Sequence, residues 1–125
     1  MMSALNSALA GMNAASDQLN VAAANIANAL STGETPGDAY HAQDAVQTSK
    51  YGAPYVVVRD KAEPTVEIYA PDHSAANDNG MVEYPNVNLA EEFTNMMQAE
   101  AAYLANALML RTIDEMNDTL YEIFA

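Results

Sequence analysis

The 125-residue chain contains no cysteine and no tryptophan, and phenylalanine occurs only at Phe93 and Phe124. The lack of cysteine excludes disulfides, thiolate metal sites and cysteine nucleophiles. Half of the residues are hydrophobic, but many of these are alanines, each of which buries little area. We therefore expect one small domain that depends on neighbouring chains for part of its stability.

Positive charge is also scarce. Four Lys and Arg residues stand against 17 Asp and Glu residues, so the formal net charge is -13. Residues 1–30 carry one charged side chain, Asp17, and residues 76–125 hold nine acids against Arg111 alone. Nucleic acids and anionic membranes are bound through clustered Lys and Arg, so neither is an expected partner. The acidity fits either a solvated surface or a repulsion that keeps subunits apart before assembly.

Long hydrophobic runs are absent as well. No stretch approaches the roughly 18 uninterrupted apolar residues of a membrane-spanning helix, so direct membrane insertion is not expected. The first residues lack a positive segment, and asparagines at 6, 13, 20 and 25 interrupt any apolar one. A cleavable secretory signal is therefore not expected, and export would need another route.

The usual constellations of catalytic residues are missing. His41 and His73 are the only histidines, and neither belongs to a spaced ligand pair. Asp72, Asp78 and Glu83 do not match calcium-loop spacing, and no nucleophile elbow or phosphate-binding loop is present. We expect no catalytic, cofactor-binding or metal-binding residues, and an enzyme built on the loop at 72–78 is the weakest alternative.

A seven-residue repeat dominates residues 3–30. Large apolar residues stand at 5, 12, 19 and 26, and alanines stand three places later at 8, 15, 22 and 29. These are the a and d positions of a heptad, and they predict a long helix with a close helix–helix contact. Coiled-coil packing and an ordinary amphipathic helix over a small core both fit. The repeating asparagines at 6, 13 and 20 fit either bonds across an interface or solvent.

The rest of the chain divides into two zones. Residues 31–85 are punctuated by glycine and proline, and residues 55–59 and 65–69 predict two strands that pair antiparallel. Residues 40–48 and 81–84 predict weaker extended pieces. Either Asn86 or Asn88 suits a helix N-cap. The negative charges of Glu91 and Glu92 would then stabilise the first turn of this helix. A helical pattern without glycine or proline continues to Phe124.

The expected fold is mainly α with a small β insert. Helices in residues 1–30 and 86–125 form an antiparallel coiled-coil pair, and residues 31–85 form a β-rich insert containing a short hairpin, all in one structural unit. The expected assembly interface consists of apolar residues on both helices: Leu5, Leu9, Met12, Leu19, Ile26, Leu89, Phe93, Met96, Tyr103, Leu110, Ile113, Met116 and Leu120.

Several segments resemble one family of proteins. Residues 25–29, NIANA, match the core motif of flagellar rod, hook and related axial proteins. Residues 68–73 (IYAPDH), 76–82 (ANDNGMV) and 85–88 (PNVN) resemble the FlgC family of proximal-rod proteins, although Ser74, Met81 and Leu104 depart from its pattern. The motif residues carried over are Asn25, Ala27, Asn28, Tyr69, Pro71, His73, Gly80, Pro85, Asn86 and Asn106.

This resemblance implies a structural subunit of the proximal rod of the bacterial flagellar basal body, with no enzymatic activity and no cofactor. It implies export without a cleaved signal peptide through the flagellar type III apparatus and a position in the periplasm-spanning rod. The implied partners are copies of itself and FlgB-, FlgF- and FlgG-like subunits. The terminal helices would line a tube that transmits torque and passes export substrates. A FlgB-like subunit and a soluble acidic coiled-coil adaptor or export chaperone are the alternatives.

Overall fold

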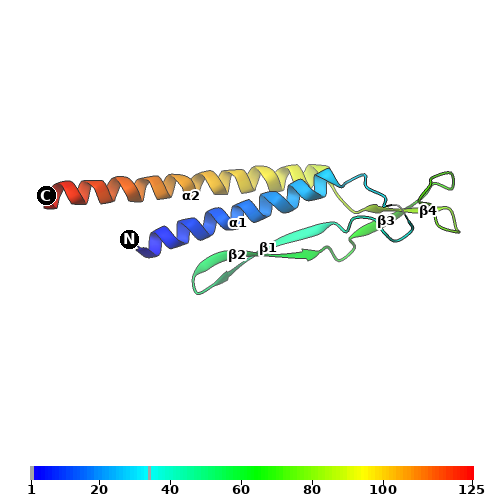
Figure 1. The fold of residues 1–125 in the computed structure, drawn as a ribbon, viewed down its shortest axis with the longest axis horizontal. Helices are drawn as coiled ribbons and strands as arrows, with labels where there is room; N and C mark the ends of the chain where they lie inside the picture. Colours follow the sequence, from blue (N-terminus) through cyan, green and yellow to red (C-terminus); the bar gives the residue numbers. More distant parts are fainter. Residues whose placement is uncertain (1, 34) are drawn as a thin grey trace.

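The computed structural model describes residues 2–33 and 35–125 and shows an elongated molecule (Figure 1). Its elements are, in order, α1 (Met2–Ala27), β1 (Gln43–Lys50), β2 (Ala53–Asp60), β3 (Thr65–Tyr69), β4 (Met81–Pro85) and α2 (Leu89–Phe124). The β1–β2 hairpin lies along α1, and the β3–β4 hairpin extends at the end away from the termini. The chain is therefore mainly α with a β insert, as expected.

Helix α1 forms where the heptad pattern predicted it, but it ends at Ala27 rather than near residue 30. The heptad alanines Ala8, Ala15 and Ala22 are all buried, at 2–3% exposure. Their small side chains let a neighbouring helix approach closely, which is why this stripe forms the packed face. The asparagines at 6, 13 and 20 are exposed, so within the monomer they face solvent.

Helix α2 begins after Asn88, the second of the two candidate caps. The Asn88 Oδ1 atom accepts the N–H groups of Ala90 and Glu91 at 3.1 and 3.3 Å. These bonds satisfy two of the donors that a helix leaves free at its start. The 36 residues of α2 exceed the 26 of α1, so α2 is longer by about 15 Å at 1.5 Å per residue.

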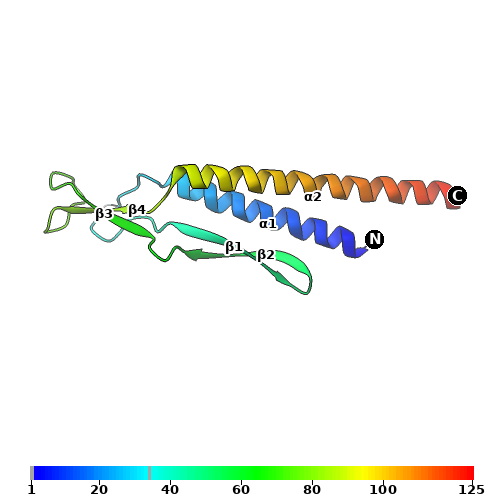
Figure 2. The same cartoon turned by 180° about the vertical axis from the view of Figure 1, so that it is seen from behind.

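The two helices lie side by side in opposite directions, with both termini at one end of the molecule (Figure 2). Two contacts fix their register. The Asn25 Nδ2 atom donates to Glu92 Oε1 at 2.9 Å, and a Cβ atom on Gly11 would lie 2.5 Å from Asn106 Oδ1. Both pairs are 14 residues apart along their helices. Continuing this register places the first residue of α1 opposite Glu115, so α2 runs past the described part of α1.

The contact between Gly11 and Asn106 yields a testable coupling. Glycine inside a helix is about 1 kcal/mol less stable than alanine, but a methyl group on Gly11 would collide with the Asn106 amide, which donates to the Ala102 carbonyl at 2.8 Å. We expect Gly11→Ala to lower the free energy of unfolding by about 1 kcal/mol. In an Asn106→Ala background we expect the same change to raise it by about 1 kcal/mol. Urea unfolding measures both, and the same sign in both backgrounds would contradict this close approach.

The β insert contains two hairpins, and the strand pairing predicted from the sequence is wrong. Strand β1 pairs with β2, and β3 pairs with β4, so residues 55–59 and 65–69 belong to different sheets. The weaker extended pieces at 40–48 and 81–84 supply their true partners. Tyr51 and Gly52 both have positive φ, 54° and 80°, which makes a two-residue turn between β1 and β2. Tyrosine rarely adopts this conformation, so the turn lacks an ordinary sequence signal.

The loop between β3 and β4 contains three of the motif residues, Pro71, His73 and Gly80, and a fourth, Tyr69, ends β3 beside it. Gly80 has a φ of 74°, and a Cβ atom there would lie 3.0 Å from side-chain atoms of Tyr69 and Pro71. His73 Nδ1 accepts the N–H of Ala75 at 3.1 Å. These residues therefore shape the loop, and the His73 side chain stabilises one of its turns.

Candidate assembly surfaces

The described residues offer little for chemistry. Within residues 2–33 and 35–125, no group of three His, Asp or Glu side chains is placed to hold a metal ion. His41 Nδ1 lies 3.1 Å from Asp60 Oδ2 at an exposed position. None of the helices in this part of the chain has the length and hydropathy that crossing a bilayer requires. The features that remain are a buried polar cluster and exposed apolar faces.

Buried polar side chains meet where α1 ends and α2 begins. Asn25 is fully buried, and its Nδ2 atom donates to the Gln43 carbonyl at 2.8 Å and to Glu92 Oε1 at 2.9 Å. Its Oδ1 atom accepts the Gln43 N–H at 3.0 Å and the Tyr40 hydroxyl at 3.1 Å. We call Asn25, Tyr40, Gln43, Lys61 and Glu92 the polar junction. It joins α1, β1, the segment after β2, and α2.

Glu92 is a carboxylate in the interior, only 2% exposed. Burying an ion this deeply costs several kcal/mol unless a partner and further hydrogen bonds compensate it. Lys61 Nζ lies 3.1 Å from Glu92 Oε1, Asn25 donates to the same atom, and Asn95 Nδ2 lies 3.5 Å from Glu92 Oε2. In the described part of the chain, every buried side-chain nitrogen and oxygen has a hydrogen-bond partner. The junction therefore holds its elements without an uncompensated polar group.

The hydroxyl of Tyr40 completes the junction. Burial raises its pKa, and the negative charges of Glu92 and Asp60 raise it further. A raised folded-state pKa stabilises the fold at pH values below the ordinary tyrosine pKa of about 10, and this contribution is lost as pH rises through the folded-state value. Tyr40 ionisation therefore weakens the junction only in alkaline solution.

Sequence reasoning identified one member of the junction, Asn25, through the family motif. Glu92 was interpreted as a favourable charge in the first turn of the second helix, where a carboxylate suits the helix dipole. Its burial against Lys61, 31 positions earlier, has no local sequence signal. Because Glu91 and Glu92 are adjacent acids at the start of the helix, the local sequence does not reveal which of the two carboxylates points inward.

The remaining motif residues have local roles. Asn28 Nδ2 donates to the carbonyl four residues earlier at 2.9 Å, and Asn86 Nδ2 donates to the Glu63 carbonyl at 2.9 Å. Pro85 is buried at the end of β4, whereas Ala27 is exposed at the end of α1. These residues shape the connections between elements.

The interface residues predicted on α1 border its contact with α2. Leu9 is exposed, and the other four residues are half-buried: Leu5, Met12, Leu19 and Ile26. The alanine stripe beside them carries the closest packing. These larger side chains therefore leave part of their apolar surface uncovered along one edge of the helix pair.

The interface residues predicted on α2 fall into two groups. Ile113 is buried, and Met96 and Leu110 are half-buried. The others are exposed: Leu89, Phe93, Tyr103, Met116 and Leu120. The structure thus separates the predicted residues that the monomer covers from those that it leaves open.

An apolar stripe, interrupted by Glu100, lies on the face of α2 turned away from α1. Its residues, which we call the outer stripe, are 47–71% exposed and recur at helical spacing: Leu89, Phe93, Met97, Leu104 and Leu108. The inward face is marked by Ala99, Asn106 and Ile113, roughly half a turn away. The last three outer-stripe residues were absent from the predicted interface. An apolar stripe of this length on an exposed helix indicates a binding surface.

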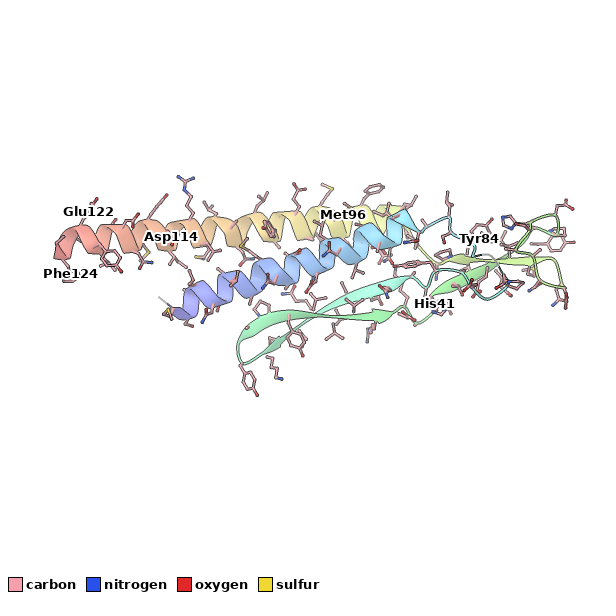
Figure 3. All side chains as sticks on the ribbon, in the orientation of Figure 1. His41, Tyr84, Met96, Asp114, Glu122 and Phe124 are labelled. Atoms are coloured by element: carbon pink, nitrogen blue, oxygen red, sulfur yellow. The ribbon has the colours of Figure 1, made fainter. Side chains whose placement is uncertain are left out.

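The end of α2 is a second uncovered surface. Residues 116–125, which we call the overhang, run past the beginning of α1, and Figure 3 shows Glu122 and Phe124 there. Its apolar side chains are 36–84% exposed: Met116, Leu120, Tyr121, Ile123 and Phe124. The overhang is therefore a second candidate binding surface beside the outer stripe.

Comparison with known proteins identifies the family. The model for the C-terminal region of flagellar basal body rod FlgEFG proteins matches residues 78–123. The flagellar basal-body rod protein FlgC of Agrobacterium fabrum is 37% identical over 109 residues, which cover 81% of this chain and 78% of that protein. FlgC of Salmonella typhimurium is 34% identical over 110 residues, 82% of each chain.

FlgC of Buchnera aphidicola subsp. Acyrthosiphon pisum is 32% identical over 125 residues, which cover 93% of this chain and 92% of that protein. A match over 93% of the chain includes parts of both helices and of the β insert, and the three relatives favour FlgC over the FlgB-like alternative. The resemblance found in the motifs is confirmed, and the chain belongs to the family of flagellar basal-body rod protein FlgC.

Proposed function

We propose that this chain is a structural subunit of the flagellar basal-body rod and has no enzymatic activity. The observation that carries the proposal is the outer stripe, an apolar face left open on a helix whose opposite face is already packed. The names of its relatives describe rod proteins, and a rod subunit needs such faces for its neighbours. In an assembly the stripe can pack against a neighbouring subunit, whereas in a monomer it stays exposed to water.

The helical part of the chain, residues 1–30 and 86–125, would be the polymerising unit, with residues 31–85 as an insert. We propose that α1 and α2 pack as an antiparallel coiled coil within it. Buried alanines at seven-residue intervals support this, as do two register contacts separated by 14 residues, or two heptads. The half-buried residues Leu5, Met12, Leu19 and Ile26 would then meet a neighbouring subunit along their open edge.

The finer assignment to the proximal rod rests on the family resemblance. It places the subunit in the periplasm-spanning part of the basal body after type III export without a cleaved signal peptide. Copies of the chain and FlgB-, FlgF- and FlgG-like subunits would be its neighbours. The assembled tube would transmit torque to the hook and pass later export substrates.

Deletion of the gene in its own host tests this function. We expect non-motile cells whose isolated basal bodies contain membrane rings but no rod, because a missing subunit stops assembly at its own layer. The intact gene should restore both the rod and swimming. Electron microscopy of basal bodies and swimming on soft agar give the two measurements. Normal rods in the deletion strain would favour the soluble acidic adaptor instead.

A further inference from the structure

The turn between β1 and β2 presents a tyrosine in an unfavourable backbone conformation. Tyr51 is 97% exposed, and in the described part of the chain it is the only residue other than glycine with a positive φ. Positive φ at both Tyr51 and Gly52 is the type I′ arrangement, for which Asn-Gly is the preferred sequence. A strained residue that the monomer leaves in water points to a role outside the monomer.

A lysine and a second tyrosine extend this tip. Lys50 Nζ lies 5.5 Å from the centroid of the Tyr51 ring, which is a cation–π distance. The strand register places Lys50 and Tyr55 on one face of the hairpin. The other face carries Gln47, whose Oε1 atom accepts a hydrogen bond from Gln18 Nε2 on α1 at 3.2 Å. Lys50, Tyr51 and Tyr55, which we call the hairpin tip, therefore form an aromatic and basic surface that α1 does not cover.

The acid that interrupts the outer stripe has the opposite charge. Glu100 stands three residues after Met97 and four before Leu104, so the three side chains are neighbours on the surface of α2. In the part of the chain that the structure describes, Glu100 belongs to no ion pair. Arg111, the only base on α2, has its Nε atom 2.9 Å from Glu115 Oε1. The outer stripe thus suits a partner that brings apolar side chains and one cation.

The hairpin tip and the outer stripe lie on opposite sides of each molecule. In both Figure 1 and Figure 2, α1 lies between α2 and the β1–β2 hairpin. Because the outer stripe faces away from α1, the tip does not reach the stripe of its own chain. A contact between two different surfaces repeats from copy to copy, and it builds a ring or an open helical assembly.

We propose that the hairpin tip of one copy docks on the outer stripe of a second copy. The two tyrosine rings would pack against apolar residues of the stripe, and Lys50 would pair with Glu100. The other three bases already have acidic neighbours within the monomer: Arg59, Lys61 and Arg111. Repulsion between distant charges is screened beyond about 8 Å at physiological salt, so the local pair decides. This inference rests on the proposed rod function and names the surfaces through which copies meet.

Exchanging the two charges tests whether the partner is a second copy. In the deletion strain we expect Lys50→Glu and Glu100→Lys each to reduce the swimming diameter at least threefold, because like charges would then face each other. The combined variant restores opposite charges between copies, and we expect it to recover most of the swimming diameter. With a different partner, the combined variant would swim no better than the single variants. That result, or normal swimming by both single variants, would overturn the proposal.

The matched control is Lys50→Glu/Glu67→Lys, which has the same net charge as the exchange variant. Glu67 is exposed in β3, and we expect this control to swim as poorly as Lys50→Glu alone. Recovery in the control would mean that total charge rather than the pair of Lys50 and Glu100 matters, and the proposal would be wrong. In each of these negative outcomes, rods restored by the intact gene would leave the rod function standing.

Tyr51→Asn separates docking from folding, because it gives the turn the preferred Asn-Gly sequence. We expect the urea concentration at half-unfolding of the purified chain to stay the same or rise. We expect the swimming diameter to fall at least threefold, since the exposed ring is lost. Swimming equal to that of the intact gene would contradict the docking role of the hairpin tip.

Cross-linking of isolated basal bodies locates the contact in the unsubstituted chain. A carbodiimide joins a lysine amine directly to a neighbouring carboxylate, and the chain has only two lysines, Lys50 and Lys61. We expect mass spectrometry to find peptides in which Lys50 is linked to Glu100. Lys50 linked instead to a different protein would refute the assignment to a second copy.

Discussion

Replacing Asn25 with alanine is expected to lower the free energy of unfolding by about 3–4 kcal/mol. The substitution removes the partner of the Gln43 N–H and the Tyr40 hydroxyl, and it takes one donor from Glu92. Each buried polar group left without a partner costs about 1–3 kcal/mol. Because Asn25 joins α1 to both β1 and α2, these losses fall at the point where the elements meet. Urea unfolding followed by circular dichroism measures the effect.

Two further variants sharpen this prediction. Asn20→Ala changes an exposed asparagine of the same helix, and we expect its unfolding free energy to stay within about 0.5 kcal/mol of the unsubstituted chain. Lys61→Met leaves the Glu92 carboxylate buried without its cation, and we expect a loss of about 3–5 kcal/mol. If Asn25→Ala unfolded at the same urea concentration as Asn20→Ala, the polar junction would not be what holds the elements together.

The combined substitution Phe93→Asp/Met97→Asp/Leu104→Asp is expected to abolish swimming while leaving the monomer folded. All three side chains are more than half exposed in the monomer, so aspartate there meets water. In the rod, the same positions would face a neighbouring subunit, where unpaired carboxylates cost several kcal/mol each. Swimming on soft agar and imaging of basal bodies test the assembly, and circular dichroism of the purified chain tests the fold.

The matched control for the outer stripe is Gln98→Asp/Ala101→Asp/Ala105→Asp. These residues are exposed on a third face of α2, and the change adds the same negative charge to the same stretch of helix. We expect cells carrying it to swim. If the control stopped swimming and the outer-stripe variant did not, the neighbour would lie on the other face and the proposed surface would be wrong.

The helices of this protein follow directly from local sequence. A seven-residue repeat of alanines predicts α1 and its packed face, because small side chains that recur on one side of a helix allow a second helix to approach closely. A cap at Asn86 or Asn88 and the unbroken helical spacing after it predict α2 to its last turn. The strand positions also follow from β-prone runs between glycines and prolines.

Strand pairing and the polar junction cannot be predicted from the local sequence. The pairing of β1 with β2 depends on a two-residue turn at Tyr51 and Gly52. Because tyrosine rarely adopts a positive φ, its presence does not predict this turn. The junction joins residues separated by 15 to 67 positions, and nothing in the local sequence near Glu92 shows that its carboxylate turns inward toward Lys61. Such contacts exist only after the chain has folded on itself.

The family, the two long helices and the absence of the usual catalytic motifs can all be predicted from the sequence, because each depends on motifs or on short-range periodicity. Tertiary structure alone decided which apolar residues stay open. Periodicity marks every apolar position on α2 alike, but the register against the shorter α1 covers Ile113 and leaves Met116 and Leu120 exposed. The surfaces that we propose for neighbouring subunits are what remains after the monomer has packed, so they depend on contacts between segments far apart in the chain.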